Sequence, residues 1–443
     1  ISIIFPMKIS FGTDGIRGPV ESAITPDLCL KIGQAAGQVL REEGCDTVLI
    51  GKDTRVSGYM LESALEAGFI AAGVNVRLLG PLPTPGVAYL TKSSRGQFGL
   101  VISASHNSYI DNGIKIFDGN GVKISRDIQH KIEKAINTNS LQIVSADKFG
   151  KAKRFDESGG RYIEFCKSTV PHNISFKGLR IVLDCAHGAA YKVSPAIFEE
   201  LGAEVIPIGT SPNGYNINDG CGSTKPDSAR KAVLEHRADF GVALDGDADR
   251  VKLIDASGNI LDGDDILYIL ASGNINRIGP WSGIVGTVMS NLGLEIAIKD
   301  LGYEFERSDV GDTFVNEILT KKGWYLGGEP SGHIICRDLV STGDGTVAAL
   351  KTISTLLLLE KDAKEALKGY NKVPQVELSI EVTNKDVLNE ASIQTRIQEI
   401  RSDLTIGRIL VRPSGTEPKI RIMVEAESES TAKKCAQDLA SLF

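Results

Sequence analysis

The sequence has 443 residues, of which 42% are hydrophobic and 24% charged, and its formal net charge is −7 at neutral pH. A chain with this balance is not expected to bind nucleic acid or an anionic membrane through a general surface, and no apolar run approaches the roughly 18–20 residues of a membrane span. The length predicts several domains, because single hydrophobic cores stop growing near about 250–300 residues.

Seven cysteines are scattered along the chain without a C-x-x-C pair. The odd number and the spacing argue against a disulfide framework or a zinc site, and they indicate reduced thiols in a cytoplasmic protein. The opening ISIIFP is apolar, but it is too short for a signal peptide and lacks a basic start. We expect the natural start at Met7, with the six residues before it as an extension.

Two short polar loops near the start contain arginine. FGTDGIRG, at residues 11–18, contains Arg17, and GKDTR, at residues 51–55, contains Arg55. Each arginine is either part of a site or, as turn arginines more often are, paired with a neighbouring carboxylate.

One strand–helix–strand pattern occurs three times, at residues 47–80, 178–209 and 283–311. Each copy has an apolar strand, a polar loop with glycine, an amphipathic helix that ends at a glycine, and a second strand. This βαβ pattern predicts parallel strands. The predicted helix ends are Gly73, Gly202 and Gly302. Because a distinct insert follows each copy, we predict three similar α/β domains rather than a solenoid.

The last 70 or so residues follow a different pattern. Residues 376–386 alternate like a half-buried strand, residues 391–402 and 430–443 have helical periodicity, and residues 407–428 predict two strands around a loop. The predicted fold is therefore α/β, with three similar mixed-sheet α/β domains and a C-terminal α+β domain. The predicted domain boundaries are 1–157, 158–256, 257–372 and 373–443.

Residues 101–117, VISASHNSYIDNGIKIF, predict a polar loop between two short strands. A hydrolase couple of Ser105 and His106 is not expected, because neighbouring side chains of an extended segment point to opposite faces and no G-x-S-x-G motif surrounds the serine. Ser105 either caps the loop or carries a phosphoryl group beside a metal ion. His106 fits a positioning residue better than a base, and Lys115 is either a site residue or simply solvated.

Three aspartates follow the predicted strand DFGVAL in the segment ALDGDADRVKLID. Asp245, Asp247 and Asp249 would repel one another in one loop unless a cation neutralised them, and hard oxygen ligands suit Mg²⁺. An EF-hand is excluded, because its sixth position would be Arg250 rather than glycine. The alternative is a solvated acidic turn.

Residues 326–338, LGGEPSGHIICRD, present a carboxylate and a hydroxyl from a glycine-rich loop. Glu329 and Ser331 suit recognition of sugar hydroxyls, although the same composition is typical of a plain turn. His333 is either part of this site or a core histidine.

The segment VRPSGTEPKIRIMVE, at residues 411–425, has the composition of a phosphate-binding loop, with guanidinium donors, hydroxyls and a permissive backbone. It is not a Walker loop, since no GxxxxGK[ST] motif is present. A solvated basic hairpin is the alternative. The candidate phosphate ligands are Arg412, Ser414, Gly415, Thr416 and Arg421.

Together these loops resemble one known family, the α-D-phosphohexomutases. The motifs GTDGIRG, SASHN with DNGIKIF, DGDADR, GEPSGH and RPSGTEPKIR occur in that order from residue 11 to residue 421. The resemblance is therefore specific and covers nearly the whole chain. It implies four domains, three of them similar α/β units, with the active site in the central cleft. SASHN and the stretches at 212–223, 310–315 and 341–345 are most similar to the bacterial branch that interconverts glucosamine 6-phosphate and glucosamine 1-phosphate, toward UDP-N-acetylglucosamine and the cell wall.

The resemblance also implies a role for each motif. Ser105 would be a phosphoserine, and it would hold one Mg²⁺ together with the three aspartates. Lys115 and Arg250 would lie beside the transferring phosphoryl group, with His106 and Arg17 in the same catalytic set. Glu329, Ser331 and His333 would bind the sugar, and the loop from Arg412 to Arg421 would bind the phosphate that does not react.

Glucosamine 1,6-bisphosphate would be the intermediate, and glucosamine 1,6-bisphosphate or glucose 1,6-bisphosphate would be the activator. The expected partner is thus a small sugar phosphate, and the expected state is a cytoplasmic monomer or homodimer. Three positions depart from the family pattern: Ser108, Thr313 and Pro330, of which Pro330 could alter sugar selectivity. The alternatives are a phosphomannomutase/phosphoglucomutase, a phosphatase and a non-catalytic sugar-phosphate sensor.

Overall fold

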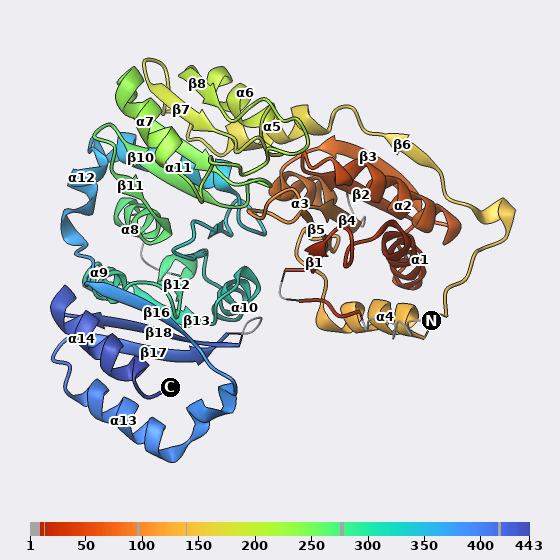
Figure 1. Cartoon of the computed structure of the whole chain (residues 1–443). Helices are drawn as coiled ribbons and strands as arrows, with labels where there is room; N and C mark the ends of the chain where they lie inside the picture. The colour runs from red at the N-terminus through yellow and green to blue at the C-terminus, as the bar shows by residue number, and fades with distance from the viewer. Residues whose placement is uncertain (1–8, 13, 95–97, 139, 275–278, 415–417) are drawn as a thin grey trace.

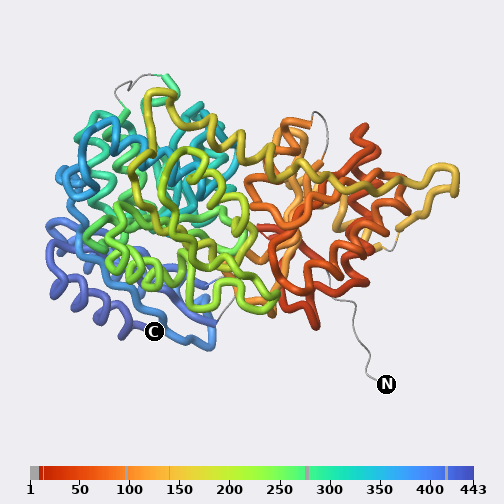
Figure 2. Tube along the Cα trace, turned by 90° about the horizontal axis from the view of Figure 1, so that it is seen from above, coloured from red at the N-terminus to blue at the C-terminus, as the bar shows by residue number. Residues whose placement is uncertain are grey.

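The computed structural model describes residues 9–443 apart from 13, 95–97, 139, 275–278 and 415–417. Four β-sheets are present in this part of the chain, each formed by consecutive segments of the sequence. Figure 1 shows the first sheet with its helices on one side of the molecule, and the second, third and fourth stacked on the other. Seen from above in Figure 2, the first unit again projects from the rest. No helix among the described residues is long and apolar enough to cross a membrane.

The first sheet is mixed, in the order β1-β5-β4-β2-β3-β6. Its strands are β1 (Ile16–Pro19), β2 (Thr47–Lys52), β3 (Asn75–Pro81), β4 (Phe98–Ile102), β5 (Asp111–Phe117) and β6 (Ala152–Arg154). Its helices are α1 (Pro26–Glu42), α2 (Ser57–Ala71), α3 (Thr84–Ser93) and α4 (Arg126–Asn137). Strand β5 is antiparallel to both of its neighbours, β1 and β4. The loop that contains Ser105 therefore reverses the direction of the chain between β4 and β5.

The second and third sheets have the orders β11-β10-β9-β7-β8 and β13-β12-β14-β15. The second contains β7 (Arg180–Asp184), β8 (Glu204–Ile208), β9 (Phe240–Leu244), β10 (Val251–Asp255) and β11 (Ile260–Leu261), with α5 (Ser158–Ser168), α6 (Val193–Glu200) and α7 (Asp227–His236). The third contains β12 (Gly283–Thr287), β13 (Glu304–Ser308), β14 (Leu326–Gly328) and β15 (Ile334–Cys336). The accompanying helices are α8 (Gly263–Gly273), α9 (Leu292–Asp300), α10 (Asp312–Lys322), α11 (Gly345–Leu359) and α12 (Ala363–Ala366).

The three predicted βαβ repeats are confirmed. They are β2–α2–β3, β7–α6–β8 and β12–α9–β13, and in each the two strands pair in parallel. The glycines predicted to end the three helices have positive φ values of 84°, 101° and 87°. A left-handed residue stops an α-helix, and glycine adopts that conformation without a steric penalty.

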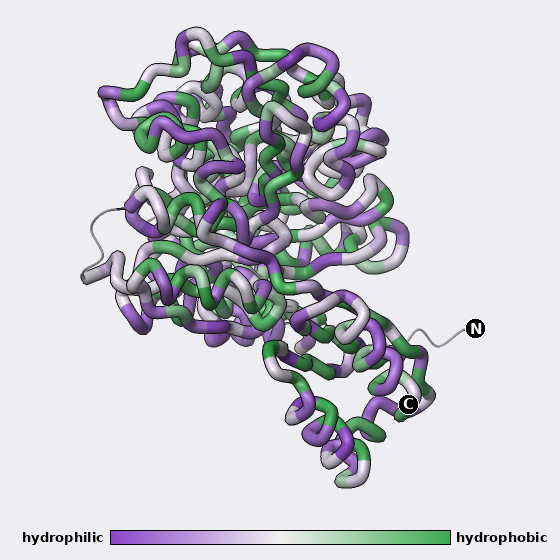
Figure 3. The backbone as a smooth tube through the Cα atoms, turned by 90° about the vertical axis from the view of Figure 1, so that its left-hand side faces the viewer, coloured by the Kyte–Doolittle hydropathy of each residue, from purple (hydrophilic) through white to green (hydrophobic). Residues whose placement is uncertain are grey.

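The C-terminal unit has an antiparallel sheet in the order β16-β18-β17. It consists of β16 (Gln375–Glu381), α13 (Ala391–Ser402), β17 (Gly407–Pro413), β18 (Lys419–Ala426) and α14 (Glu429–Ala440), so the predicted α+β character is confirmed. This unit has its own hydrophobic cluster, whereas one continuous cluster joins the other three units. Figure 3 shows the C-terminal residues as a lobe below the main body.

Polar contacts attach this lobe to the third unit. The buried Glu425 carboxylate accepts the Leu292 N–H at the start of α9 (2.8 Å), and the Arg408 guanidinium donates to the Val288 and Ser290 carbonyl oxygens (2.7 and 2.9 Å). Asn291 exchanges two hydrogen bonds with the backbone of Val373, where the chain enters the lobe. A lobe with a separate core and a polar junction is suited to move relative to the rest.

Candidate active site

Two loops from different sheets meet at the site. Ser105 follows β4, and the aspartate loop follows β9, each at the carboxyl end of a buried strand. Ser105 is 1% exposed, and its hydroxyl donates to Asp245 Oδ2 at 2.6 Å. The loop backbones pack so closely that a Cβ added to Gly246 would lie 2.6 Å from the Ser105 carbonyl oxygen. Only glycine allows this approach, and it brings the serine onto the aspartates.

The relation of Ser105 to His106 differs from the prediction. Ser105 is not extended but left-handed (φ 51°), so the two side chains do not point to opposite faces, and Oγ lies 3.4 Å from His106 Nδ1. That distance is long for a hydrogen bond between a nucleophile and its base, and the shorter partner of Oγ is Asp245. Burial, with Arg250 and Arg17 nearby, lowers the pKa of His106 to about 4, so its imidazole is neutral at pH 7.

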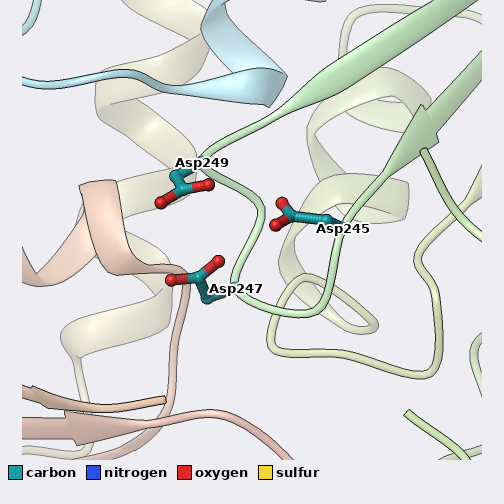
Figure 4. A group of neighbouring side chains, drawn as sticks. All are labelled: Asp245, Asp247 and Asp249. Atoms are coloured by element: carbon teal, nitrogen blue, oxygen red, sulfur yellow. The ribbon is translucent and has the colours of Figure 1, made fainter. Parts of the chain in front are cut away.

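The three aspartates converge, as Figure 4 shows. All three are buried, and one ligand oxygen of each lies within 4.8 Å of the other two. Two of their oxygens, Asp247 Oδ1 and Asp249 Oδ1, are buried and have no hydrogen-bond partner among the described residues. Buried carboxylates with free lone pairs fit a hard divalent cation. The solvated acidic turn is therefore wrong.

The aspartates differ in their protonation. Burial, followed by Asp249 and Asp247, raises the pKa of Asp245 well above its usual value. Burial also acts to raise the pKa of Asp249, but Lys115 and His333 outweigh it and hold that pKa well below the usual value. A bound cation would favour the ionised form of Asp245.

Lys115 lies on β5 and is buried, so the prediction of a merely solvated lysine is excluded. Its Nζ is 3.0 Å from Asp247 Oδ2, 3.1 Å from Asp249 Oδ2 and 3.3 Å from Asp14 Oδ2. Burial opposes its charged form, but these three carboxylates outweigh burial and raise its pKa well above the usual value. Lys115 is thus a fixed cation at the centre of the site.

Arg250 and Arg17 complete the cationic side. The Arg250 N–H donates to Asp245 Oδ1 at 3.1 Å, and its guanidinium Nε lies 3.9 Å from Asp249 Oδ1. Arg17, on β1, pairs with Asp14, the carboxylate that also contacts Lys115. The pairing expected of a turn arginine is therefore present, and it connects Arg17 to the site.

The predicted sugar loop lies between β14 and β15, next to the aspartates. His333 is buried between two carboxylates, with Nδ1 3.7 Å from Asp249 and Nε2 3.6 Å from Asp312. Burial opposes its charge, but these carboxylates raise its pKa to about 9. The Glu329 carboxylate accepts the Gly311 N–H (3.1 Å), and burial raises its pKa. Ser331 Oγ is buried without a partner among the described residues, so a hydroxyl is available to a ligand.

The predicted phosphate loop lies on the C-terminal lobe. Arg412 on β17 is directly opposite Arg421 on β18, and the buried Ser414 donates its N–H to the Lys419 carbonyl oxygen at 2.8 Å. Like charges placed opposite each other destabilise a sheet, so an anion between them would be favourable. Gly415 and Thr416 lie outside the described residues.

The site also contains Arg55, which was a candidate from the sequence, and three residues that were not singled out: Asp14, Thr84 and Asn218. The buried Arg55 donates from Nη2 to the Ser105 and Asn107 carbonyl oxygens (3.1 and 2.6 Å), and Asn218 Nδ2 donates to the same two oxygens (2.9 and 3.0 Å). Thr84 Oγ1 donates to Asp247 Oδ2 at 2.6 Å. Asp14 stands in the GTDGIRG motif, which could have suggested it, and Asn218 lies in the stretch 212–223 that was noted only for its family branch, whereas Thr84 carries no local signal.

The chain is similar to known proteins over nearly its whole length. The chain matches the four models of one family, described as phosphoglucomutase/phosphomannomutase alpha/beta/alpha domain I (residues 8–142), domain II (160–258), domain III (262–373) and C-terminal domain (362–442). It is 52% identical over 437 residues to the phosphoglucosamine mutase of Cellvibrio japonicus, with 98% of each chain covered. It is 51% identical over 433 residues to that of Aeromonas hydrophila, with 97% of each covered.

Two solved structures are similar in fold. A phosphoglucomutase/phosphomannomutase family protein from Burkholderia thailandensis superposes with a TM-score of 0.81 at 24% identity, covering 97% of this chain and 96% of that one. N-acetylphosphoglucosamine mutase of Aspergillus fumigatus, solved with GlcNAc-6P and magnesium, gives a TM-score of 0.69 at 17% identity, covering 98% and 95%.

Proposed function

The chain belongs to the phosphoglucomutase/phosphomannomutase family, and on this basis we propose that it interconverts glucosamine 6-phosphate and glucosamine 1-phosphate. It is an intramolecular phosphotransferase of the isomerase class. Its product would feed the synthesis of UDP-N-acetylglucosamine. The observation that carries the chemistry is the Ser105 hydroxyl, held 2.6 Å from Asp245 within a convergent set of three buried aspartates.

In the proposed reaction, phosphorylated Ser105 transfers its phosphoryl group to the free hydroxyl of the sugar phosphate. The sugar 1,6-bisphosphate then turns around, and Ser105 takes back the other phosphoryl group. Phosphoryl transfer depends mainly on alignment and charge stabilisation. Arg55 and Asn218 fix the Ser105 backbone, while Lys115 and Arg250 supply positive charge beside the transferring group.

The carboxylates of Asp245, Asp247 and Asp249 would hold one Mg²⁺, with the Ser105 phosphate as a further ligand. When bound, the cation would neutralise charge on the transferring phosphoryl group. His106, neutral at pH 7, would position the Ser105 loop rather than carry charge. Arg17 would act through Asp14, which it pairs with beside Lys115.

The sugar and its second phosphate would bind on the other side of the cleft. Glu329 and Ser331 would hold the sugar hydroxyls, with His333 beside them. Arg412, Ser414, Gly415, Thr416 and Arg421 would hold the phosphate that does not react. Because the sugar presents its two ends in turn, one phosphate clamp serves both half-reactions. Closure of the C-terminal lobe would exclude water, which would otherwise hydrolyse the phosphoserine.

We also propose that glucosamine 1,6-bisphosphate or glucose 1,6-bisphosphate activates the enzyme by phosphorylating Ser105. The proposed organisation is four domains with boundaries after residues 157, 256 and 372. The proposed state of the protein is a cytoplasmic monomer or homodimer. The support for the division is that each segment contains the strands of one sheet, except that β11 (Ile260–Leu261) lies just after the boundary at 256 and pairs with β10 of the second sheet.

The test is a Mg²⁺-dependent assay of glucosamine 1-phosphate formation from glucosamine 6-phosphate, with a trace of 1,6-bisphosphate. Glucose and mannose 6-phosphates are run beside it at equal concentrations. A strong preference for the amino sugar supports the proposal. A preference for glucose or mannose would instead identify a phosphoglucomutase/phosphomannomutase and direct attention to the loop of Pro330. Steady phosphate release without dependence on bisphosphate would identify a phosphatase.

A further inference from the structure

A cavity of about 380 Å³ lies between the first and third α/β units. One wall is the segment that leads into α4, and the other is α10, which faces it across the junction in Figure 1. Its described lining includes neither Ser105 nor the three aspartates. The apolar part of the wall is formed by Val122, Ile124 and Ile335. The volume is within the range of about 300–1,000 Å³ that is typical of small-molecule sites.

Two side-chain amides line this cavity from opposite walls. Gln129 Oε1 on α4 and Asn316 Oδ1 on α10 are both buried, and neither has a hydrogen-bond partner among the described residues. The Gln129 amide is oriented by its Nε2, which donates to the Ile124 carbonyl oxygen at 3.1 Å. A buried acceptor without a donor is costly, so two of them in one cavity point to a ligand with donors.

Two of the charged side chains that line the cavity, Lys123 and Asp312, pair with each other, and the other three, Arg126, Glu317 and Lys321, are exposed to solvent. Lys123 Nζ lies 2.7 Å from Asp14 in its own unit and 2.8 Å from Asp312 in the third unit, and the second of these ion pairs joins the two units. A charged ligand would enter apolar walls with no buried counter-charge left for it. The chemistry of the cavity therefore favours an uncharged ligand.

We propose that this cavity binds a small uncharged molecule with an apolar ring and two O–H or N–H donors, bonded to Gln129 and Asn316. Such a ligand would bridge α4 and α10. Helix α10 begins at Asp312, which faces His333, and the preceding Gly311 N–H holds the Glu329 carboxylate. Binding of a ligand in the cavity is therefore coupled to the position of the sugar loop. The ligand and the sugar phosphate change each other's affinity by the same factor, about 5-fold or more. This last consequence alone rests on the proposed function.

The probe is resorcinol, an uncharged ring with two O–H donors, and the matched ligand control is 1,3-dimethoxybenzene, which has none. Calorimetry on the full chain should show resorcinol binding about 5- to 150-fold more tightly, the range for two neutral hydrogen bonds. The variant Gln129→Met/Asn316→Leu should abolish this difference. Gln437→Leu, an exposed amide of α14, should leave it unchanged.

A second measurement distinguishes lost recognition from misfolding. Gln129→Met would also remove the hydrogen bond to the Ile124 carbonyl oxygen, so the melting temperature is measured on Asn316→Leu alone. Because this variant removes one unsatisfied acceptor, its ligand-free melting temperature should rise or stay equal while resorcinol binding weakens. Equal binding of the two probes, or unchanged discrimination in the double variant, overturns the proposal. So does a crystal of the resorcinol-soaked enzyme with only ordered water between the amides. None of these measurements needs turnover, so they stand if the proposed reaction fails.

Discussion

Arg55 links the stability of the first unit to the geometry of the loop that contains Ser105. Its guanidinium is fully buried, pairs with the buried Asp53, and donates to the carbonyl oxygens of Ser105 and Asn107. The substitution Arg55→Met keeps the length of the side chain but leaves the Asp53 carboxylate and two carbonyl oxygens without this donor. Burial already raises the pKa of Asp53, and Arg55 counteracts it, so the variant raises that pKa further.

Removal of one partner of a buried ion pair costs about 3–5 kcal/mol. At about 2–4 °C per kcal/mol for a unit of this size, the first melting transition should fall by roughly 6–20 °C. Scanning calorimetry measures the transition, and kcat/KM for glucosamine 6-phosphate measures the function. Activity should fall as well, because the Ser105 backbone loses one of its two side-chain donors.

The matched control is Asp53→Asn/Arg55→Met, which removes both charges. It should regain part of the lost melting temperature, because no unpaired carboxylate is left buried, yet its activity should stay low. A drop of less than about 1 kcal/mol in the single variant, or recovery of full activity in the double variant, would refute the assignment of Arg55 as the anchor of the Ser105 loop.

Three further predictions concern the serine, the buried histidine and the phosphate loop. Ser105→Ala should reduce mutase turnover by about 10³-fold or more, while Mg²⁺ and sugar phosphate still bind in calorimetry. Ser108→Ala is the matched control in the same loop. Near-wild-type turnover in Ser105→Ala would contradict the phosphoserine mechanism. His333 has a folded pKa of about 9 against a usual 6.5, so its charged form stabilises the Mg²⁺-free fold fully below pH 6.5, and this contribution is lost as the pH rises through 9. In EDTA, the melting temperature of the wild type should show that loss with rising pH, and the melting temperature of His333→Gln should depend less on pH. The exposed control His130→Gln should behave as the wild type. The same pH dependence in the wild type and His333→Gln would contradict this role of His333. Arg412→Gln should raise KM for glucosamine 6-phosphate by about 10- to 150-fold, as expected for one lost charge-assisted contact, and should not lower the melting temperature, because it relieves repulsion with Arg421. Exposed Arg396→Gln on α13 is the control, and an unchanged KM in Arg412→Gln removes that residue from the phosphate site.

Local sequence patterns predicted the elements of this fold well. The three βαβ repeats appear as parallel strand pairs around a helix, and the helix predicted at residues 391–402 has those bounds in α13. These features depend on hydrophobic periodicity and on glycine at helix ends, which act over a few residues. The aspartate loop was also predictable, since three carboxylates at alternate positions already imply a cation.

The composition of the site depended on contacts between distant segments. Ser105 meets Asp245 across 140 positions, and Thr84 meets Asp247 across 163, so no local pattern relates them. Even the neighbours Ser105 and His106 were oriented wrongly from the sequence, because the left-handed backbone at Ser105 arises where its loop packs on Gly246 and Asn218. Local periodicity selects strands and helices through short-range hydrogen bonding and burial. Which loops then share a buried site, and which side chains lose their water there, depends on how the separate sheets pack against one another.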